Sequence, residues 1–185
     1  MLTVYTIGHS TRSLEELAEL LVQNKIELLA DVRTIPRSRM NPQFNKEAMP
    51  ESLAAFGIAY VHISALGGLR GHMKSDIPSP NSGWENASFR NFADYTLTVE
   101  FEAGYKELIL LAKARRTAIM CSEAVWWRCH RRIITDYLLA RGIAVLHIMS
   151  KSTIEEATMT KFAEVTDTRK VIYPAEQYDL GMPLF

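Results

Sequence analysis

Segments typical of β-strands alternate with segments of helical periodicity along most of the chain, and this alternation limits the fold to the α/β class. Strands are predicted over residues 2–7, 26–32, 58–63, 117–120 and 143–148. Strands that alternate with helices pair in parallel, and their right-handed crossovers place helices on both faces of the sheet. We therefore expect a three-layer, Rossmann-like fold whose mainly parallel sheet has about five strands.

Local patterns indicate where the intervening helices begin and end. Ser13 and Glu16 form a capping box ahead of leucines that repeat at helical spacing. Helices are also predicted over residues 49–56, 89–114 and 125–140, and the second of these can consist of two helices that meet near Val99. Gly57 and Gly142 follow two of these helices at the position that favours a left-handed residue.

The chain is predicted to form a single domain, because its 185 residues, 48% of them hydrophobic, suffice for one core without disulfides. Residues 1–150 carry the α/β core, and residues 151–185 are interpreted as a C-terminal extension of the same domain. Residues 67–88 are rich in Gly, Pro, Ser and Asn and are too long for a routine connection. They form either a mobile excursion or, as we expect, a lid.

Charge and targeting patterns restrict the partners and the location. The 21 basic and 21 acidic residues create no net field that would attract DNA or an anionic membrane, so a nucleic-acid contact needs a local basic patch. The sequence has no run of about 18 apolar residues and no signal-peptide pattern at its start. We expect a cytoplasmic protein that does not bind membranes, in which Cys121 and Cys129 are free, reactive or metal-binding thiols.

Polar and ionisable residues stand at the end of every predicted strand. They are His9 and Ser10, Asp31 and Arg33, His62, Cys121 to Glu123, and His147. Ligands of open parallel sheets bind beyond the carboxyl ends of the strands, where loops and helix amino termini converge. We therefore predict an active site or a nucleotide-binding site at this edge of the sheet.

Cys121 is the first candidate for a reactive group. It is predicted at the junction of a buried strand and a helix amino terminus, where the helix dipole and basic neighbours would lower the pKa of the thiol. Glu123, two residues on, would then act as a general acid or base. In the alternative interpretation Cys121 is a small buried core residue and Glu123 is a favourable charge at the helix start.

The predicted helix after Cys121 carries residues suited to an anionic ligand. Arg128 and Arg131 would share a cationic face for phosphate or carboxylate. Trp126 and His130 would lie close together, and the indole could stack a base. In the alternative interpretation these arginines form a solvated face, and Trp127 and Cys129 lie in the core.

The loop after the second strand is also basic, and its arginines are Arg33, Arg37 and Arg39. Asp31 would orient one of them or accept a sugar hydroxyl of a phosphorylated ligand. His9 and Ser10 would supply a general base and a hydrogen-bond donor. A purely structural Asp-Arg pair, and a structural role for His9 and Ser10, remain alternatives.

Cofactor patterns are weak. A zinc site can be drawn from His9, Cys121, Cys129 and His130, but the paired short cysteine spacings typical of zinc sites are absent from the sequence. The phosphate-binding patterns GxGxxG and GxxxxGK[ST] are absent as well. The sequence therefore assigns no metal ligand and identifies no cofactor.

Several motifs together resemble the domain-of-unknown-function 488 family. They are TIGHS at Thr6 to Ser10, DVRTIPRSR at Asp31 to Arg39, LGGLRG at Leu66 to Gly71, MCSE from Met120 and CHRRII from Cys129. The resemblance extends over residues 3–148 and implies no established activity. The characteristic residues of the family correspond to His9, Ser10, Asp31, Arg33, Arg37, Ser38, Arg39, Cys121, Glu123, Cys129, His130 and Arg131.

Two fainter resemblances concern other functions. The DVR motif is similar to that of rhodanese-like sulfurtransferases, but Glu123 and bulky Trp126 follow Cys121 where those enzymes have a tight anion-binding loop of small residues. Residues 177–185 faintly resemble peptides that dock on bacterial sliding clamps, although two extra residues separate the Gln from the final Leu-Phe. A tail that packs on its own domain is the favoured interpretation.

These observations support three functional hypotheses. The leading one is an enzyme that acts on a nucleotide or nucleic-acid base, in which arginines hold the phosphate, tryptophan stacks the base, and Glu123 or Cys121 performs the chemistry. The second is a non-catalytic module that binds nucleic acid or a nucleotide through the same arginines. The third is a thiol-based sulfurtransferase or redox protein, which requires an acidic thiol at Cys121.

Overall fold

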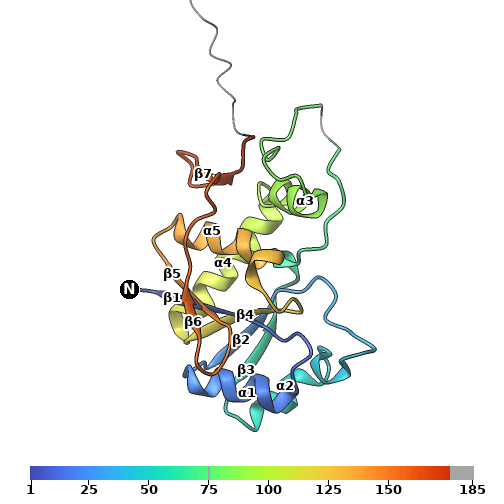
Figure 1. The fold of residues 1–185 in the computed structure, drawn as a ribbon, viewed down its shortest axis with the longest axis vertical. Helices are drawn as coiled ribbons and strands as arrows, with labels where there is room; N and C mark the ends of the chain where they lie inside the picture. The colour runs from blue at the N-terminus through green and yellow to red at the C-terminus, as the bar shows by residue number, and fades with distance from the viewer. Residues whose placement is uncertain (75, 176–185) are drawn as a thin grey trace, which may run out of the picture.

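The computed structural model describes residues 1–74 and 76–175, and a six-stranded sheet forms its centre (Figure 1). The strands are β1 (Thr3–Gly8), β2 (Leu28–Asp31), β3 (Ala59–His62), β4 (Thr117–Cys121), β5 (Ala144–Ile148) and β6 (Ile154–Glu156). They lie in the order β3-β2-β4-β1-β5-β6, with β1 to β5 parallel and β6 antiparallel to β5. The predicted Rossmann-like α/β fold and its five strands are confirmed, and β6 was not predicted.

Helices cover both faces of this sheet. They are α1 (Leu14–Gln23), α2 (Met49–Ala54), α3 (Ala87–Tyr95), α4 (Val99–Ala114) and α5 (Arg131–Leu139), with short 3-10 helices η1 (Pro42–Phe44), η2 (Ser64–Leu66) and η3 (Trp126–Arg128). Successive strand side chains point to opposite layers. Tyr5 packs in a cluster with residues of α1 and α2, whereas Val4 packs in a cluster with residues of α4 and α5.

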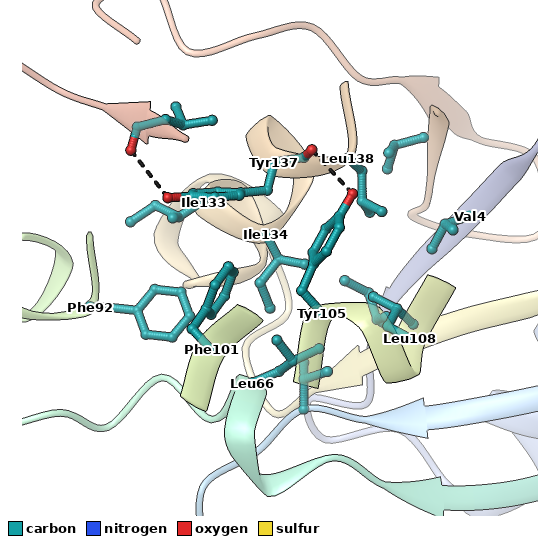
Figure 2. Packing of buried hydrophobic residues seen from close by; sticks show 14 of the residues in the cluster. Val4, Leu66, Phe92, Phe101, Tyr105, Leu108, Ile133, Ile134, Tyr137 and Leu138 are labelled. Atoms are coloured by element: carbon teal, nitrogen blue, oxygen red, sulfur yellow. Dashed lines mark hydrogen bonds between the residues drawn. The ribbon is translucent and has the colours of Figure 1, made fainter. Parts of the chain in front are cut away.

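The core between α4 and α5 is aromatic and contains internal hydrogen bonds (Figure 2). The rings of Phe101 and Tyr137 meet edge-on with their centroids 4.9 Å apart. The Tyr105 hydroxyl donates to the Tyr137 carbonyl at 3.2 Å, and the Tyr137 hydroxyl donates to the Val171 carbonyl at 3.3 Å. Val171 begins β8 (Val171–Ile172), which pairs with β7 (Glu164–Val165). This contact therefore fastens the C-terminal segment onto α5.

One predicted helix begins too early. The sequence predicts a helix over residues 125–140, but α5 begins at Arg131, and the chain from Ser122 to His130 is a loop that contains η3. The cause is long-range pairing, because the N–H groups of His9 and Ser10 donate at 2.9 Å to the carbonyls of Cys121 and Ser122. This pairing keeps the chain extended beyond β4, so Cys121 lies at the start of a loop rather than at a helix amino terminus.

The other helix boundaries follow the local patterns. Both hydrogen bonds of the capping box between Ser13 and Glu16 form, and Gly57 and Gly142 have φ values of +72° and +73°. The long segment consists of two helices, and the Thr98 side chain caps the second. The segment between η2 and α3 has neither helix nor strand in the residues described there. No described helix is long and apolar enough to cross a membrane.

Candidate functional site

A cavity of about 750 Å³ opens at the carboxyl ends of β1, β2 and β4, and we call it the carboxyl-end cavity. β1 and β4 are neighbours, and the chain leaves them for α1 on one face and for α5 on the other. Open α/β sheets bind ligands in the crevice at such a position. The predicted site residues that line the cavity are His9, Ser10, Arg33, Arg37, Cys121, Glu123, Arg128 and His130.

Two thiols and an imidazole form a cluster on the wall of this cavity. Nε2 of His130 lies 2.9 Å from the carbonyl oxygen of Val32, which can only accept, so Nε2 donates a hydrogen bond there. In the neutral ring the lone pair is then on Nδ1, which lies 3.8 Å from Sγ of Cys121 and 3.6 Å from Sγ of Cys129. A Cβ on Gly68 would come within 2.4 Å of the His130 ring, so the glycine leaves room for it.

A buried arginine lies behind Cys129. Arg131 is 1% exposed, and it donates from Nε to Sγ of Cys129 at 3.2 Å and from Nη2 to the Glu123 carbonyl at 2.6 Å. Among the described residues no carboxylate forms an ion pair with Arg131. A buried charge without a counter-ion is costly, so this arrangement favours a negative charge on the Cys129 sulfur.

The two thiols consequently differ in acidity. Burial tends to raise the pKa of Cys129, but the hydrogen bond from Cys121 and the charge of Arg131 outweigh it and lower this pKa. The hydrogen bond to Cys129, together with burial, raises the pKa of Cys121. The expectation of a lowered pKa at Cys121 is therefore wrong. The helix amino terminus expected there is absent, and the guanidinium contacts the other sulfur.

Below the cavity, the buried carboxylate of Asp31 fixes the orientation of Arg33. Nε and Nη2 of Arg33 donate to its two oxygens at 2.9 and 2.5 Å, and the Tyr60 hydroxyl donates to Oδ2 at 2.7 Å. Nη1 of Arg33 donates to Nε2 of His9 at 3.2 Å, so His9 carries its proton on Nδ1 and donates it to the Ser10 carbonyl at 2.9 Å. Burial and then the Arg33 charge lower the pKa of His9 to about 4, so the ring is neutral near pH 7.

The mouth of the cavity is cationic. Arg37 and Arg128 line it and are exposed, and Arg37 pairs loosely with Glu47 at 3.1 Å through side chains that are 70% and 66% exposed. The exposed side chain of Glu123 lines the same cavity. An anionic group that enters would therefore meet the guanidinium groups of Arg37 and Arg128 and, on the same lining, one carboxylate.

Some predicted site residues lie outside the lining. Arg39 is exposed beyond it, and Arg131 is buried behind it. Trp126 stacks on His147 with ring centroids 4.5 Å apart, and its Nε1 donates to Glu155 at 3.0 Å. Because one face of the indole is covered and the ring does not line the cavity, Phe89, which does line it, is better placed to stack a base.

Cys129 lines the cavity, but the sequence does not single it out as a site residue. From the sequence it is interpreted as a core residue, as a free, reactive or metal-binding thiol, or as one member of a weak zinc set. Its position next to Arg131 and the His130 lone pair depends on how the loop after β4 folds back. The local pattern Cys-His-Arg is the feature that could have identified it, since a base and a guanidinium adjoin a thiol.

Comparisons with known proteins identify a family without an assigned function. The family model described as "Domain of unknown function DUF488" matches residues 13–138. No curated protein and no solved structure matched the chain. The matched range includes the DVR motif and the segment from Cys121 to Arg131, and it begins after the TIGHS motif. Since this range covers more than half of the chain, the protein belongs to the DUF488 family.

Proposed function

We propose that the protein is an enzyme that acts on a nucleotide or nucleic-acid base bound in the carboxyl-end cavity. The observation that carries the proposal is the oriented lone pair of His130, which faces two sulfur atoms on the wall of a cavity with arginines at its mouth. A module that only binds its ligand would use the arginines, but it has no need for a base held against a thiol.

The substrate class follows from the lining. Guanidinium groups such as those of Arg37 and Arg128 hold phosphate through paired donors, and an aromatic ring such as that of Phe89 offers a face to a base. Ligand pockets for small molecules measure on the order of 300–1,000 Å³. The volume of about 750 Å³ therefore suits one nucleotide or one base of a single strand.

The reactive groups of the proposal lie on one wall. The Nε–H of Arg131 stabilises negative charge on Cys129, and His130 accepts a proton from the cluster. Glu123 lines the cavity and is exposed, so it can carry protons between the cavity and solvent. Asp31, Arg33 and His9 form a buried network that holds the neighbouring loop in place.

Calorimetry with nucleosides and the corresponding nucleotides tests the substrate class. We expect tighter binding of the nucleotides, and this advantage should shrink at high salt because guanidinium–phosphate contacts are screened. Chromatography of nucleotides incubated with the full chain tests turnover. Cys129→Ala should retain binding and lose turnover. Binding without turnover in the unaltered chain would instead support the binding module.

A further inference from the structure

We propose that Cys121, Cys129 and His130 form a zinc site whose fourth coordination position opens into the carboxyl-end cavity. The two Sγ atoms and Nδ1 lie within 4.8 Å of one another. Bond lengths of about 2.3 Å to sulfur and 2.0 Å to nitrogen place these ligand atoms roughly 3.6 Å apart in a tetrahedral zinc site. The observed Nδ1–Sγ distances of 3.6 and 3.8 Å match this spacing, so the side chains need little movement to bind the ion.

The donor set also favours zinc over magnesium and calcium. Two thiolates and an imidazole suit zinc, whereas magnesium and calcium prefer oxygen ligands. The zinc site considered from the sequence includes His9 as a ligand, and this assignment is wrong. The ring nitrogens of His9 form hydrogen bonds with Arg33 and the Ser10 carbonyl, and His9 is not part of the cluster. The short cysteine spacing is unnecessary here, since the loop after β4 returns Cys129 to the side of Cys121.

Groups around the three ligands support metal binding. A histidine that ligates zinc usually donates its other N–H to a carbonyl or carboxylate, and Nε2 of His130 donates to the Val32 carbonyl at 2.9 Å. Nε of Arg131 donates to Sγ of Cys129 at 3.2 Å, which is a favourable contact for a ligating sulfur. Two thiolates balance the charge of the ion, so the bound cluster is neutral, and Arg131 still donates to a thiolate that ligates the metal.

The fourth position distinguishes this site from a structural one. Within the part of the chain that the structure describes, the cluster contains three ligands and no fourth His, Cys, Asp or Glu. All three ligands line the carboxyl-end cavity. Zinc with three protein ligands and an open position binds and activates water or substrate. For catalysis this inference rests on the proposed function. With zinc bound, the thiolates and the Nδ1 lone pair of His130 hold the metal, and the open position replaces them as the reactive centre.

The experiment uses the full chain, stripped by a chelator under reducing conditions and then dialysed against Zn²⁺ or Co²⁺. Elemental analysis should find about one zinc ion per chain. The Co²⁺ form should show the visible absorption of tetrahedral cobalt together with a thiolate charge-transfer band. Cys121→Ser and His130→Ala should lose both bands, whereas His72→Ala, a change at an exposed histidine outside the cavity lining, should keep them.

Substoichiometric zinc in the unaltered chain, or equal binding by His130→Ala, would overturn the zinc site. Circular dichroism shows whether each variant folds. If a variant does not fold, the zinc site is judged from the cobalt spectrum of the unaltered chain, which must show both bands. The outcome is separable from that of the proposed function. If the chain binds zinc but no nucleotide, the metal site is supported and the proposed function is contradicted. If the chain binds and converts nucleotides without zinc, the proposed function is supported and the metal site is contradicted.

Discussion

Two hollows of similar size lie at opposite ends of the sheet, and they differ in how their charged groups are paired. The carboxyl-end cavity measures about 750 Å³, and a second hollow of about 600 Å³ lies at the amino ends of β1 and β5 against α4. In the second hollow Arg141 pairs with Glu102 at 3.0 Å and covers the Tyr105 ring at 4.2 Å. Behind the carboxyl-end cavity Arg131 contacts a sulfur instead. A buried arginine that contacts a sulfur, rather than the volume, therefore distinguishes the candidate site from the second hollow.

Replacing the two arginines tests this difference most strongly. Arg131→Ala removes a buried charge and leaves the Cys129 sulfur and the Glu123 carbonyl without their donor. We expect a loss of about 3 kcal/mol in the free energy of unfolding. Arg141→Ala removes a partly exposed ion pair and a cation–π contact, which should cost about 1 kcal/mol. Urea denaturation at pH 7 measures both, and equal losses would contradict the comparison.

Acid should destabilise the carboxyl-end side through two buried histidines, His9 and His147, whose pKa values both lie at about 4, and His147 can be tested apart from the cavity lining. Its Nδ1 lies 2.7 Å from the Thr6 hydroxyl, and its buried Nε2 has no hydrogen-bond partner in the described chain. Burial, with a smaller contribution from Arg131, lowers its pKa from 6.5 to about 4. Between these pH values the unfolded chain binds a proton at His147 and the folded chain does not. The contribution of His147 to stability is therefore complete above pH 6.5 and is lost as the pH falls toward 4, by about 3 kcal/mol at most.

Urea denaturation of His147→Asn between pH 4 and 7 measures this contribution. The amide can keep a hydrogen bond to Thr6 but does not bind a proton, so the slope of stability against pH should flatten. The lining of the second hollow contains no histidine, and the exposed His72 offers a matched control. A slope that His72→Asn flattens as much as His147→Asn would contradict the assignment.

The sequence predicted those parts of the molecule that depend on local contacts. The capping box at Ser13 and the left-handed Gly57 need only neighbours in the chain, and the strands follow from apolar runs. The start of α5 could not be predicted in this way, because the N–H groups of β1's end hold Cys121 and Ser122 extended from far away in the sequence. The same distant pairing decides which thiol meets Arg131. The edge of the sheet at which the candidate site lies was therefore predictable, and the acidity of each sulfur was not.

Gly68→Ala should disturb the carboxyl-end cavity and should destabilise the protein less than Arg131→Ala does. The added Cβ would lie 2.4 Å from the His130 ring, so the ring must shift from the position in which Nδ1 faces both sulfur atoms. We expect a destabilisation of about 1–2 kcal/mol and loss of the cobalt spectrum. Gly71→Ala, three residues on, meets nothing within 4 Å and should preserve both properties. Thermal denaturation and cobalt absorption of the two variants separate displacement of His130 from a general effect on the loop.

Arg128→Ala should have the smallest effect of these changes, a modest loss of nucleotide affinity. Together with Lys113→Ala it compares the two hollows as binding sites. Arg128 is exposed and lines the carboxyl-end cavity, whereas Lys113 is exposed and lines the second hollow. Loss of one exposed phosphate contact should weaken nucleotide binding by about 1 kcal/mol, or roughly fivefold, at low salt. Lys113→Ala should leave the dissociation constant unchanged in the same calorimetric titration. Equal weakening by both changes would show that nucleotides bind through general charge, and the carboxyl-end cavity would then not be a specific site.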